Sequence, residues 1–400
     1  MLSDGVGQPA LERPFDSAQD RPQRADEAGR LAGGSAVLAI PVASRQVPHL
    51  VRLRAWGGVA TRLVYAVGAV LLFVLALEVL KRGAGGIKPF LDGISAEGTV
   101  NLLGLGWIGP YLVMSGSPVA AIALSLFAGG TISDTEAFAM INGTRLGASF
   151  IVLFVGFLYY VGRRRTADGL YIGAVALLTA FTIWLPVLPL GTLVLRQGWF
   201  DGLSLAPPGA FTSVVDVVYD PAVGLAADHL PRLLMFVLGV GLLLTSFWVF
   251  DRVLPNLEQP SLRFERVSNL LHHPLSMFGL GLLITALTLS VSISLTLLVP
   301  LSLKGYVRRE SIIPYVMGAN ISTWVDTLLA ALLLNSPRAS TIVITEMALG
   351  SLVSLTVLLL FYRPYSRLIL ALAHAATRSR RAFALFLGAI FVVPLALLLS

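Results

Sequence analysis

The fold of this chain is decided by a short pattern that occurs twice. Residues 114–117 read Met-Ser-Gly-Ser, and Gly143, in the stretch Ile-Asn-Gly-Thr-Arg, follows 29 residues after the first of them. Residues 289–292 read Leu-Ser-Val-Ser, and Gly318 again follows after 29 residues. The two glycines are 175 positions apart. Hydroxyl groups and glycines within apolar sequence are costly in a bilayer unless they line a cavity or face protein, so their repetition indicates a functional feature.

The composition is that of an integral membrane protein. Of the 400 residues, 56% are hydrophobic and 13% are charged, and the mean hydropathy is +0.81, whereas about 25% of a soluble globular chain is charged. The net charge of +7 does not indicate a nucleic-acid partner, because lysine and arginine gather at the ends of apolar runs. The absence of cysteine excludes thiolate metal sites, disulfides and cysteine nucleophiles.

Residues 1–50 differ from the rest of the chain. They are rich in Asp, Glu, Arg, Gln, Pro and Gly, and they contain no apolar core of the length that a secretory signal needs. We expect a disordered cytosolic tail. The alternative is that the protein starts near Val47.

Nine apolar segments follow the tail. They lie at about 60–80, 100–128, 136–161, 171–195, 232–254, 276–303, 311–334, 341–362 and 383–399. Shifting the first four starts by 175 residues gives 235, 275, 311 and 346, which are close to the starts of the next four. The duplication therefore spans the whole membrane core, and the ninth segment is an addition.

The segments at 100–128 and 276–303 are too long for one simple crossing, and the serine pattern interrupts both. In the first, Pro118 directly follows the pattern and disfavours a continuous helix. Each half has about 12 to 14 residues, the length of a re-entrant segment, so we predict hairpins that enter and leave by one face. Only with two hairpins does the arginine triplet at 163–165 lie inside, as the positive-inside rule requires. Three basic residues are exceptions, because they lie outside in this topology: Lys81, Arg82 and Lys88.

These features predict an all-α integral membrane protein. Each repeat has three crossings, an odd number, so the second copy is inverted relative to the first, as in many secondary transporters. The predicted fold is two inverted repeats, each with a re-entrant broken-helix hairpin and three transmembrane helices, plus one extra C-terminal helix. The predicted parts are the tail at 1–50, a first membrane repeat at 51–195, an extracellular linker at 196–231, a second membrane repeat at 232–362, and a cytosolic loop with the extra helix at 363–400. We expect a multi-pass protein of the plasma (inner) membrane with a cytosolic N-terminus.

The chain resembles the type II sodium/phosphate cotransporter family. Each inverted repeat of that family carries Gln-Ser-Ser-Ser followed by Gly-Ala/Ser-Asn-Ile-Gly-Thr. The second copy here is close to this pattern, with residues 289–292 followed by Gly-Ala-Asn-Ile-Ser-Thr at 318–323. Met114 and Leu289 replace the two motif glutamines, and Arg145 replaces the asparagine of the first copy. The resemblance covers nearly all of the membrane core and implies symport of inorganic phosphate with Na⁺.

The hydroxyls at the two interruptions are the first candidates for ligand binding. Where a helix is broken, the following half presents free N–H groups and partial positive charge to an anion, and unwound carbonyls suit sodium. The alternative is that the hydroxyls bond to their own helices or help helices to pack. The predicted substrate- and ion-binding residues are Ser115, Ser117, Gly143, Thr144, Arg145, Ser290, Ser292, Ser294, Asn320, Ser322, Thr323 and Asp326.

Arg145 stands well inside its apolar segment, where an arginine costs at least about 2.5 to 3.5 kcal/mol. It either holds an oxyanion directly, since a guanidinium matches that geometry, or forms a structural pair with Asp326. Asp326 has two alternatives of its own, which are to bind sodium or to carry a proton. Glu346 lies nearer a membrane end, where we expect a hydrated helix terminus.

The predicted function is cation-coupled symport of inorganic phosphate. Carrying a divalent phosphate into a negative interior costs about 4.6 kcal/mol at 100 mV, so uphill uptake needs cations that move with it. Sodium follows from the resemblance, and protons through Asp326 are the alternative. The sequence shows no nucleophile with a base, no phosphate-binding glycine loop and no catalytic metal spacing, so we predict neither an enzyme nor a cofactor.

Two other functions stay open. The same fold could carry a different anion or small solute, for which the two lost glutamines are the best argument. The chain could also be a non-transporting membrane component that binds a partner or lipid and has lost its site. The sequence does not indicate the oligomeric state.

Overall fold

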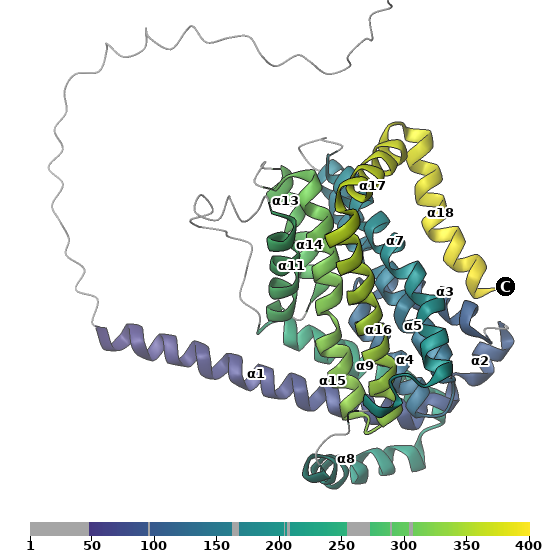
Figure 1. Ribbon diagram of the computed structural model, residues 1–400. Helices are drawn as coiled ribbons and strands as arrows, with labels where there is room; N and C mark the ends of the chain where they lie inside the picture. The colour runs from purple at the N-terminus through teal and green to yellow at the C-terminus, as the bar shows by residue number, and fades with distance from the viewer. Residues whose placement is uncertain are drawn as a thin grey trace, which may run out of the picture. The chain divides into compact units, whose positions relative to one another are not determined.

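The structure is a computed structural model that describes residues 48–94, 97–161, 168–203, 205, 209–253, 273–288, 290–303 and 307–400. All regular structure in these ranges is helical (Figure 1), which confirms the predicted all-α class for the described part of the chain. The predicted tail up to position 47, the arginine triplet at 163–165 and Leu289 lie outside the described residues. Residues 56–400 form one compact unit.

The helices fall into two halves and an addition. The first half contains α1 (Pro48–Gly83), η1 (Ala84–Gly86), α2 (Lys88–Gly93), α3 (Thr99–Val113), α4 (Gly116–Ala128), α5 (Asp134–Ala148), α6 (Phe150–Tyr159) and α7 (Asp168–Gln197). The connection contains η3 (Asp201–Leu203) and α8 (Gly209–His229). The second half contains α9 (Arg232–Asp251), α11 (Pro274–Thr288), α12 (Val291–Thr296), α13 (Leu298–Leu303), α14 (Arg309–Ser322), α15 (Trp324–Leu333), α16 (Pro337–Thr356), the π-helix η5 (Val357–Phe361) and α17 (Tyr362–Thr377). The addition is α18 (Arg380–Leu398).

Among the described residues, seven helical stretches are long and apolar enough to cross a membrane, as expected of a multi-pass membrane protein. They are Thr61–Gly86, Asp134–Tyr159, Asp168–Gln197, Arg232–Asp251, Arg309–Leu333, Pro337–Thr377 and Arg380–Leu398. These stretches overlap the seven segments that were predicted to cross. The two predicted hairpin segments instead contain shorter apolar helices, with α3 and α4 in the first and α11 to α13 in the second.

The helix boundaries repeat along the chain. Thr99 and Pro274, the first residues of α3 and α11, are 175 positions apart, and so are the last residues of these two helices. The same offset relates α4 to α12 and α13 taken together. It also relates Asp134 to Arg309, the first residues of α5 and α14. Both halves are therefore interrupted at the same places.

In the first half, two glycines bring α3 and α5 into close contact. A Cβ added to Gly106 would overlap the carbonyl oxygen of Met140, and one added to Gly143 would overlap that of Leu103. Because backbone atoms cannot rotate away as a side chain can, both positions require glycine.

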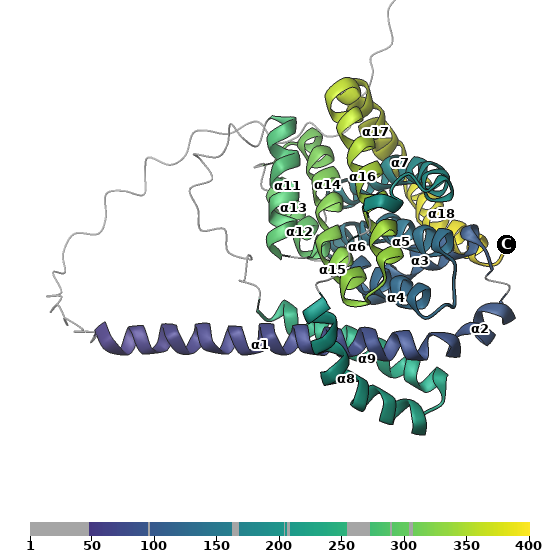
Figure 2. The ribbon, with the colours of Figure 1, turned by 60° about the horizontal axis from the view of Figure 1, so that its bottom comes forward.

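The second half repeats this contact between α11 and α14, which lie side by side in Figures 1 and 2. Gly281 approaches the carbonyl oxygen of Tyr315, and Gly318 approaches that of Phe278. Each of these four residues lies 175 positions after its counterpart in the first half. The repeat therefore extends from helix boundaries to individual packing contacts.

The two halves contact each other through their interrupted segments. Helix α4 packs against α15 of the second half, and α12 packs against α6 of the first half. The contact is reciprocal, because α6 follows α5 in the first half as α15 follows α14 in the second. Each interrupted segment thus lies against a long crossing of the other half.

Charged contacts also join the halves at the starts of helices. Arg338, at the start of α16, pairs with Asp134 of α5 at 2.7 Å between Nη2 and Oδ2, and with Asp201 of η3. Arg309, at the start of α14, pairs with Asp168 of α7. The contacts of Arg338 thus join the start of α16 to one acidic residue of the first half and one of the connection.

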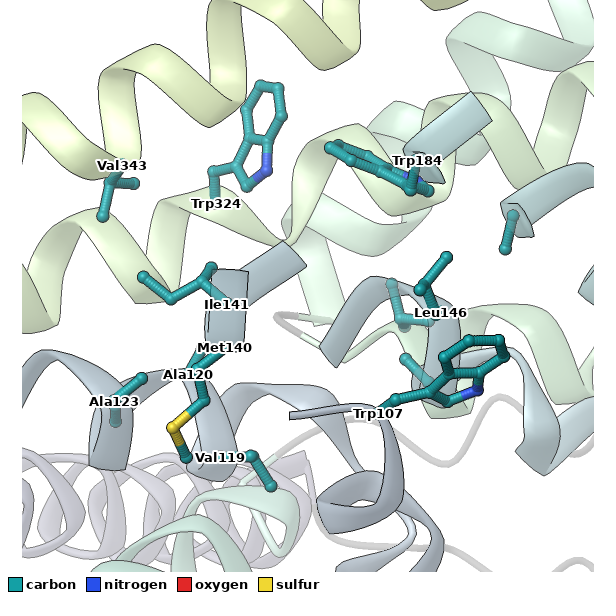
Figure 3. Close-up of a cluster of buried hydrophobic side chains, with 14 of the residues drawn as sticks. Trp107, Val119, Ala120, Ala123, Met140, Ile141, Leu146, Trp184, Trp324 and Val343 are labelled. Carbon is teal, nitrogen blue, oxygen red and sulfur yellow. The ribbon is translucent and has the colours of Figure 1, made fainter. Parts of the chain in front are cut away.

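The core between the halves is built on large aromatic side chains. The rings of Trp184 of α7 and Trp324 of α15 meet edge to face with centroids 6.1 Å apart (Figure 3), an arrangement that aromatic rings favour. Gly350 of α16 lies directly against the ring of Trp184. This packing fixes α15 and α16 relative to α7.

Residues 363–377 form a helix where we expected a loop. The π-helix η5 joins α16 to α17, and Pro364 lies in the first turn of α17. Because proline has no N–H to donate to the residue four positions before it, the wider π turn accommodates the missing bond. Ile369 and Ala373, four residues apart, are both buried and give α17 one packed face. Helix α1 likewise begins at Pro48, before the apolar segment predicted from about 60.

The additional helix α18 packs on α3. Asn101 donates from Nδ2 to the carbonyl oxygen of Leu398 at 3.2 Å, and the Tyr111 hydroxyl donates to the carbonyl oxygen of Ile390 at 3.1 Å. Gly104 of α3 lies against the backbone of α18. Its counterpart Gly279 in α11 has no atom of the described residues within 4 Å of an added Cβ. The ninth segment therefore breaks the similarity of the two halves.

Candidate functional site

The first interruption has no side-chain cap. Met114 adopts a left-handed conformation with a φ of 55°, which is uncommon for a residue other than glycine. Ser115 is extended at the N-cap of α4, but its hydroxyl accepts no hydrogen bond from that helix. The first N–H groups of α4 thus keep the donor capacity that makes a helix N-terminus suited to an anion.

The second interruption is capped and tied to its own half. The Ser290 hydroxyl accepts a hydrogen bond from the N–H of Ile293 at 3.2 Å. The Ser294 hydroxyl accepts from Thr285 at 2.7 Å and shares a hydrogen bond with the Tyr315 hydroxyl at 2.8 Å. These bonds connect α11, α12 and α14, so the hydroxyls of this interruption are mostly used within the second half.

The two interruptions meet. The Ser292 hydroxyl donates to the backbone carbonyl oxygen of Met114 at 2.8 Å. Carbonyl groups at a helix end have no partner within the helix, and this bond satisfies the end of α3 from the other half. The starts of α4 and α12 are therefore close together.

Arg145 of α5 reaches from the first half into the second. Its side chain is almost completely buried, with an exposed fraction of 1%. Nη1 donates to the Thr323 hydroxyl at 2.7 Å, and Nη2 donates to the Thr327 hydroxyl at 3.4 Å. Nε lies 3.5 Å from Oε1 of Glu346. A buried arginine needs a counter-charge, and Glu346 supplies it.

Glu346 is not the hydrated helix terminus that the sequence analysis expected. Its exposed fraction is 0%. The expectation was wrong because α16 begins at Pro337, before the apolar segment predicted from 341, so Glu346 lies in the third turn of its helix. It pairs with Arg145 across the two halves.

Asp326 joins this contact from the first turn of α15. Its Oδ1 accepts hydrogen bonds from the N–H of Thr327 at 2.7 Å and from the hydroxyl of the same residue at 3.2 Å. The Ser117 hydroxyl and the charge of Arg145 also act on this carboxylate. Asp326 therefore links the first interruption to the arginine. The ion pair that Arg145 forms is with Glu346, however, and not with Asp326 as the structural alternative proposed.

Several buried polar atoms near this contact have no hydrogen-bond partner among the described residues. They include Nε of Arg145, both carboxylate oxygens of Glu346, Oδ2 of Asp326, Oδ1 of Asn320, the hydroxyl of Ser322, and both polar side-chain atoms of Asn142, one turn before Arg145 on α5. Since buried polar groups are nearly always hydrogen-bonded, this concentration of unpartnered atoms marks a candidate binding site.

The charges of this site do not balance. Arg145 contributes one positive charge, and Asp326 and Glu346 contribute two negative charges when both are ionised. The excess negative charge is unfavourable in a buried environment and is relieved by a proton or a cation. The site can therefore hold an anion at the start of α4 and near Arg145, and a positive charge at the carboxylates.

Comparison with known proteins does not extend this picture. No family model, curated protein or solved structure matches the chain.

The twelve predicted residues separate into two groups. Five make contacts between the halves, namely Ser117, Arg145, Ser292, Thr323 and Asp326, and three lie within three residues of these in sequence, namely Ser115, Asn320 and Ser322. The other four are engaged within their own half: Gly143 against α3, Thr144 through a hydrogen bond to Ile141, and Ser290 and Ser294 in the second interruption.

Three residues of the site were not among the predicted set: Asn142, Thr327 and Glu346. Thr327 lies one turn after Thr323, and this spacing is the signal that could have found it, because residues four apart share a helix face. Glu346 is a lone carboxylate within apolar sequence. The energetic cost of placing a carboxylate within a membrane-spanning segment was itself a signal for a buried partner.

Proposed function

We propose that this protein is a secondary active transporter that carries inorganic phosphate across the membrane together with a cation. The observation that carries the proposal is the meeting of two interrupted helices, one from each half, at Ser292 and Met114. The buried Arg145 is connected to the first interruption through Asp326, with which both Ser117 and Arg145 interact. Broken helices that meet at a repeat interface are the usual binding site of such transporters. Sodium is the cation that the resemblance implies, and a proton is the alternative.

The proposed architecture is two inverted repeats with re-entrant hairpins. The shared offset of 175 residues in helix boundaries and the reciprocal packing of α4 on α15 and α12 on α6 support it. Both ends of the first interrupted segment also lie near the start of α5. The N–H of Gly98, just before α3, donates to Glu136 at 2.8 Å, and α4 ends six residues before Asp134. We place the protein in the plasma membrane with its N-terminus in the cytosol, on the charge distribution.

In this proposal the anion binds at the uncapped start of α4. The N–H groups of Gly116 and Ser117, the Ser115 hydroxyl and the Arg145 guanidinium are its donors. The contacts from Arg145 to Thr323 and Thr327 join the two halves, so movement of one half against the other changes them. No covalent step is needed, and the protein acts without enzymatic catalysis or a cofactor.

Uptake of phosphate by the purified full chain in proteoliposomes tests the proposal. Radiolabelled phosphate is added under an inward gradient of sodium, of potassium or of protons, with gradient-free vesicles as the baseline. The proposal expects accumulation above baseline with sodium or protons and none with potassium. Sulfate and other oxyanions, tested in parallel, decide whether the lost motif glutamines changed the substrate. If no gradient drives any oxyanion, the proposal fails and a non-transporting role is favoured.

A further inference from the structure

Glu346 accepts fewer hydrogen bonds than Asp326, the other buried carboxylate of the site. Neither of its oxygens has a hydrogen-bond partner among the described residues. The closest cation, Nε of Arg145, is 3.5 Å away, whereas a charge-assisted hydrogen bond is about 2.7 to 2.9 Å long. Asp326, by contrast, accepts two hydrogen bonds from Thr327. The ionised form of Glu346 therefore depends on Arg145 alone among the described residues.

The elements around α16 supply few charges to Glu346. Arg145 from α5 contacts it, Asp326 from α15 interacts with the same arginine, and α4 contains no titratable residue. The remaining charged groups on the helices packed against α16 lie at helix ends or pair elsewhere: Asp134 and Glu136 of α5, Asp168 and Arg196 of α7, Arg309 and Glu310 of α14, and Asp201 of η3. Tyr315 of α14 is bonded to Ser294. The excess negative charge beside Arg145 thus belongs to Glu346 and Asp326.

We propose that Glu346 carries the proton that is coupled to transport, and that its protonation frees Arg145 to bind the anion. The inference rests on the proposed function and names the coupling ion of that site. A proton from one side adds to a Glu346 carboxylate oxygen and ends its ion pair with Arg145. The guanidinium then faces the incoming anion as its counter-charge. After release of the anion on the other side, Glu346 loses the proton there and pairs with Arg145 again.

A proton suits this position better than a metal cation. A sodium ion on Glu346 would stand next to the guanidinium, and two positive charges in a buried site repel strongly. A proton neutralises the carboxylate without placing a second ion beside Arg145. Proton and anion then favour each other's binding, and the coupling is reciprocal.

Anion binding to the purified full chain tests this coupling. Sulfate is used beside phosphate because its charge stays constant over the neutral and alkaline range. In the wild type, affinity for both anions falls as the pH rises, since Glu346 ionises and recaptures Arg145. In Glu346→Gln, the affinity for sulfate becomes independent of pH and at alkaline pH exceeds that of the wild type by about tenfold. Glu97→Gln, an exposed residue outside the site, keeps the pH dependence of the wild type.

Transport provides the second readout. Glu346→Gln loses accumulation driven by a pH gradient, while Glu346→Asp, which restores a titratable group, retains part of it. A Glu346→Gln protein that still accumulates phosphate under a pH gradient, or binds sulfate with the pH dependence of the wild type, overturns the inference. A wild type driven by sodium but not by protons overturns it while leaving the proposed function intact.

Infrared spectroscopy tests the proton without transport. The carbonyl stretch of a protonated carboxyl should titrate in the reconstituted wild type, remain in Asp326→Asn and be absent in Glu346→Gln. Persistence of that band in Glu346→Gln would assign the proton elsewhere and overturn the inference. If the band behaves as expected while no oxyanion is transported or bound, only the proposed function fails.

Discussion

The two halves of the protein share one framework and differ in their polar chemistry. Gly106 and Gly143 in the first half and Gly281 and Gly318 in the second bring equivalent helices to equally close contact. The first interruption, however, lacks a side-chain cap, whereas Tyr315 and the serines of the second tie that interruption to its neighbours. The shared framework positions the two interruptions, and the polar residues that differ between the halves form the candidate site.

The difference in polar residues between the halves is clearest at position 145. Arg145 and Asn320 are 175 positions apart and are therefore equivalent. Arg145 carries a buried charge, whereas Asn320 carries a buried amide whose oxygen has no hydrogen-bond partner among the described residues. The two negatively charged residues at this site are Asp326 and Glu346, and both come from the second half. Neither half is a complete site.

The largest expected effect tests the shared framework. Gly143→Val and Gly318→Val each place a side chain on backbone atoms of the neighbouring helix, and we expect both to abolish recovery of folded protein. Gly279→Val, where an added Cβ meets open space, should purify normally, as judged by size-exclusion chromatography. Tolerance of the change in only one half would show that the two contacts are not equivalent.

Arg145→Met should have the next largest effect. It leaves Asp326 and Glu346 buried without their positive partner, and breaking a buried pair costs about 3 to 5 kcal/mol. The double variant Arg145→Met with Glu346→Gln should recover more thermal stability than Arg145→Met with Asp326→Asn, because the ion pair is with Glu346. Both double variants should fail to bind phosphate. Equal recovery by the two would contradict the assignment of the ion pair.

A smaller effect distinguishes the two interruptions. Tyr315→Phe removes a buried hydrogen-bond partner of Ser294 and should lower the free energy of unfolding by about 1 kcal/mol while leaving phosphate affinity close to that of the wild type. Ser115→Ala removes a hydroxyl that caps nothing, so it should leave stability unchanged and weaken phosphate binding. Thermal unfolding and equilibrium binding on the same samples measure both. If Tyr315→Phe weakened phosphate binding and Ser115→Ala did not, the anion site would be assigned to the second interruption.

The smallest effects are expected at the charged contacts between halves. Arg338→Ala and Arg309→Ala remove partly exposed ion pairs, and each should cost at most about 1 kcal/mol. The cost should fall as salt is added, because screening weakens such pairs. A large, salt-insensitive loss at either position would indicate a role beyond surface pairing.

The sequence predicted the elements of the frame and missed the connections within the site. Apolar length and the offset of 175 residues were sufficient to locate the seven stretches able to cross and the two interrupted segments. The partner of Arg145 could not be predicted, because it depends on which face of α16 turns toward α5. Predicting Glu346 as hydrated followed from an error of four residues in the start of that helix, which is one helical turn.

The most direct test of the central claim is whether the two interruptions touch. The chain contains no cysteine, so Met114→Cys with Ser292→Cys introduces the two thiols without background. A short bifunctional thiol reagent applied in native membranes should join them within one chain, and subsequent labelling with a maleimide should find no free thiol. The pair Phe73→Cys with Phe247→Cys, whose rings are 5.6 Å apart, serves as the positive control. If the control pair is joined while both thiols at positions 114 and 292 remain free, the halves do not meet at their interruptions and the account is wrong.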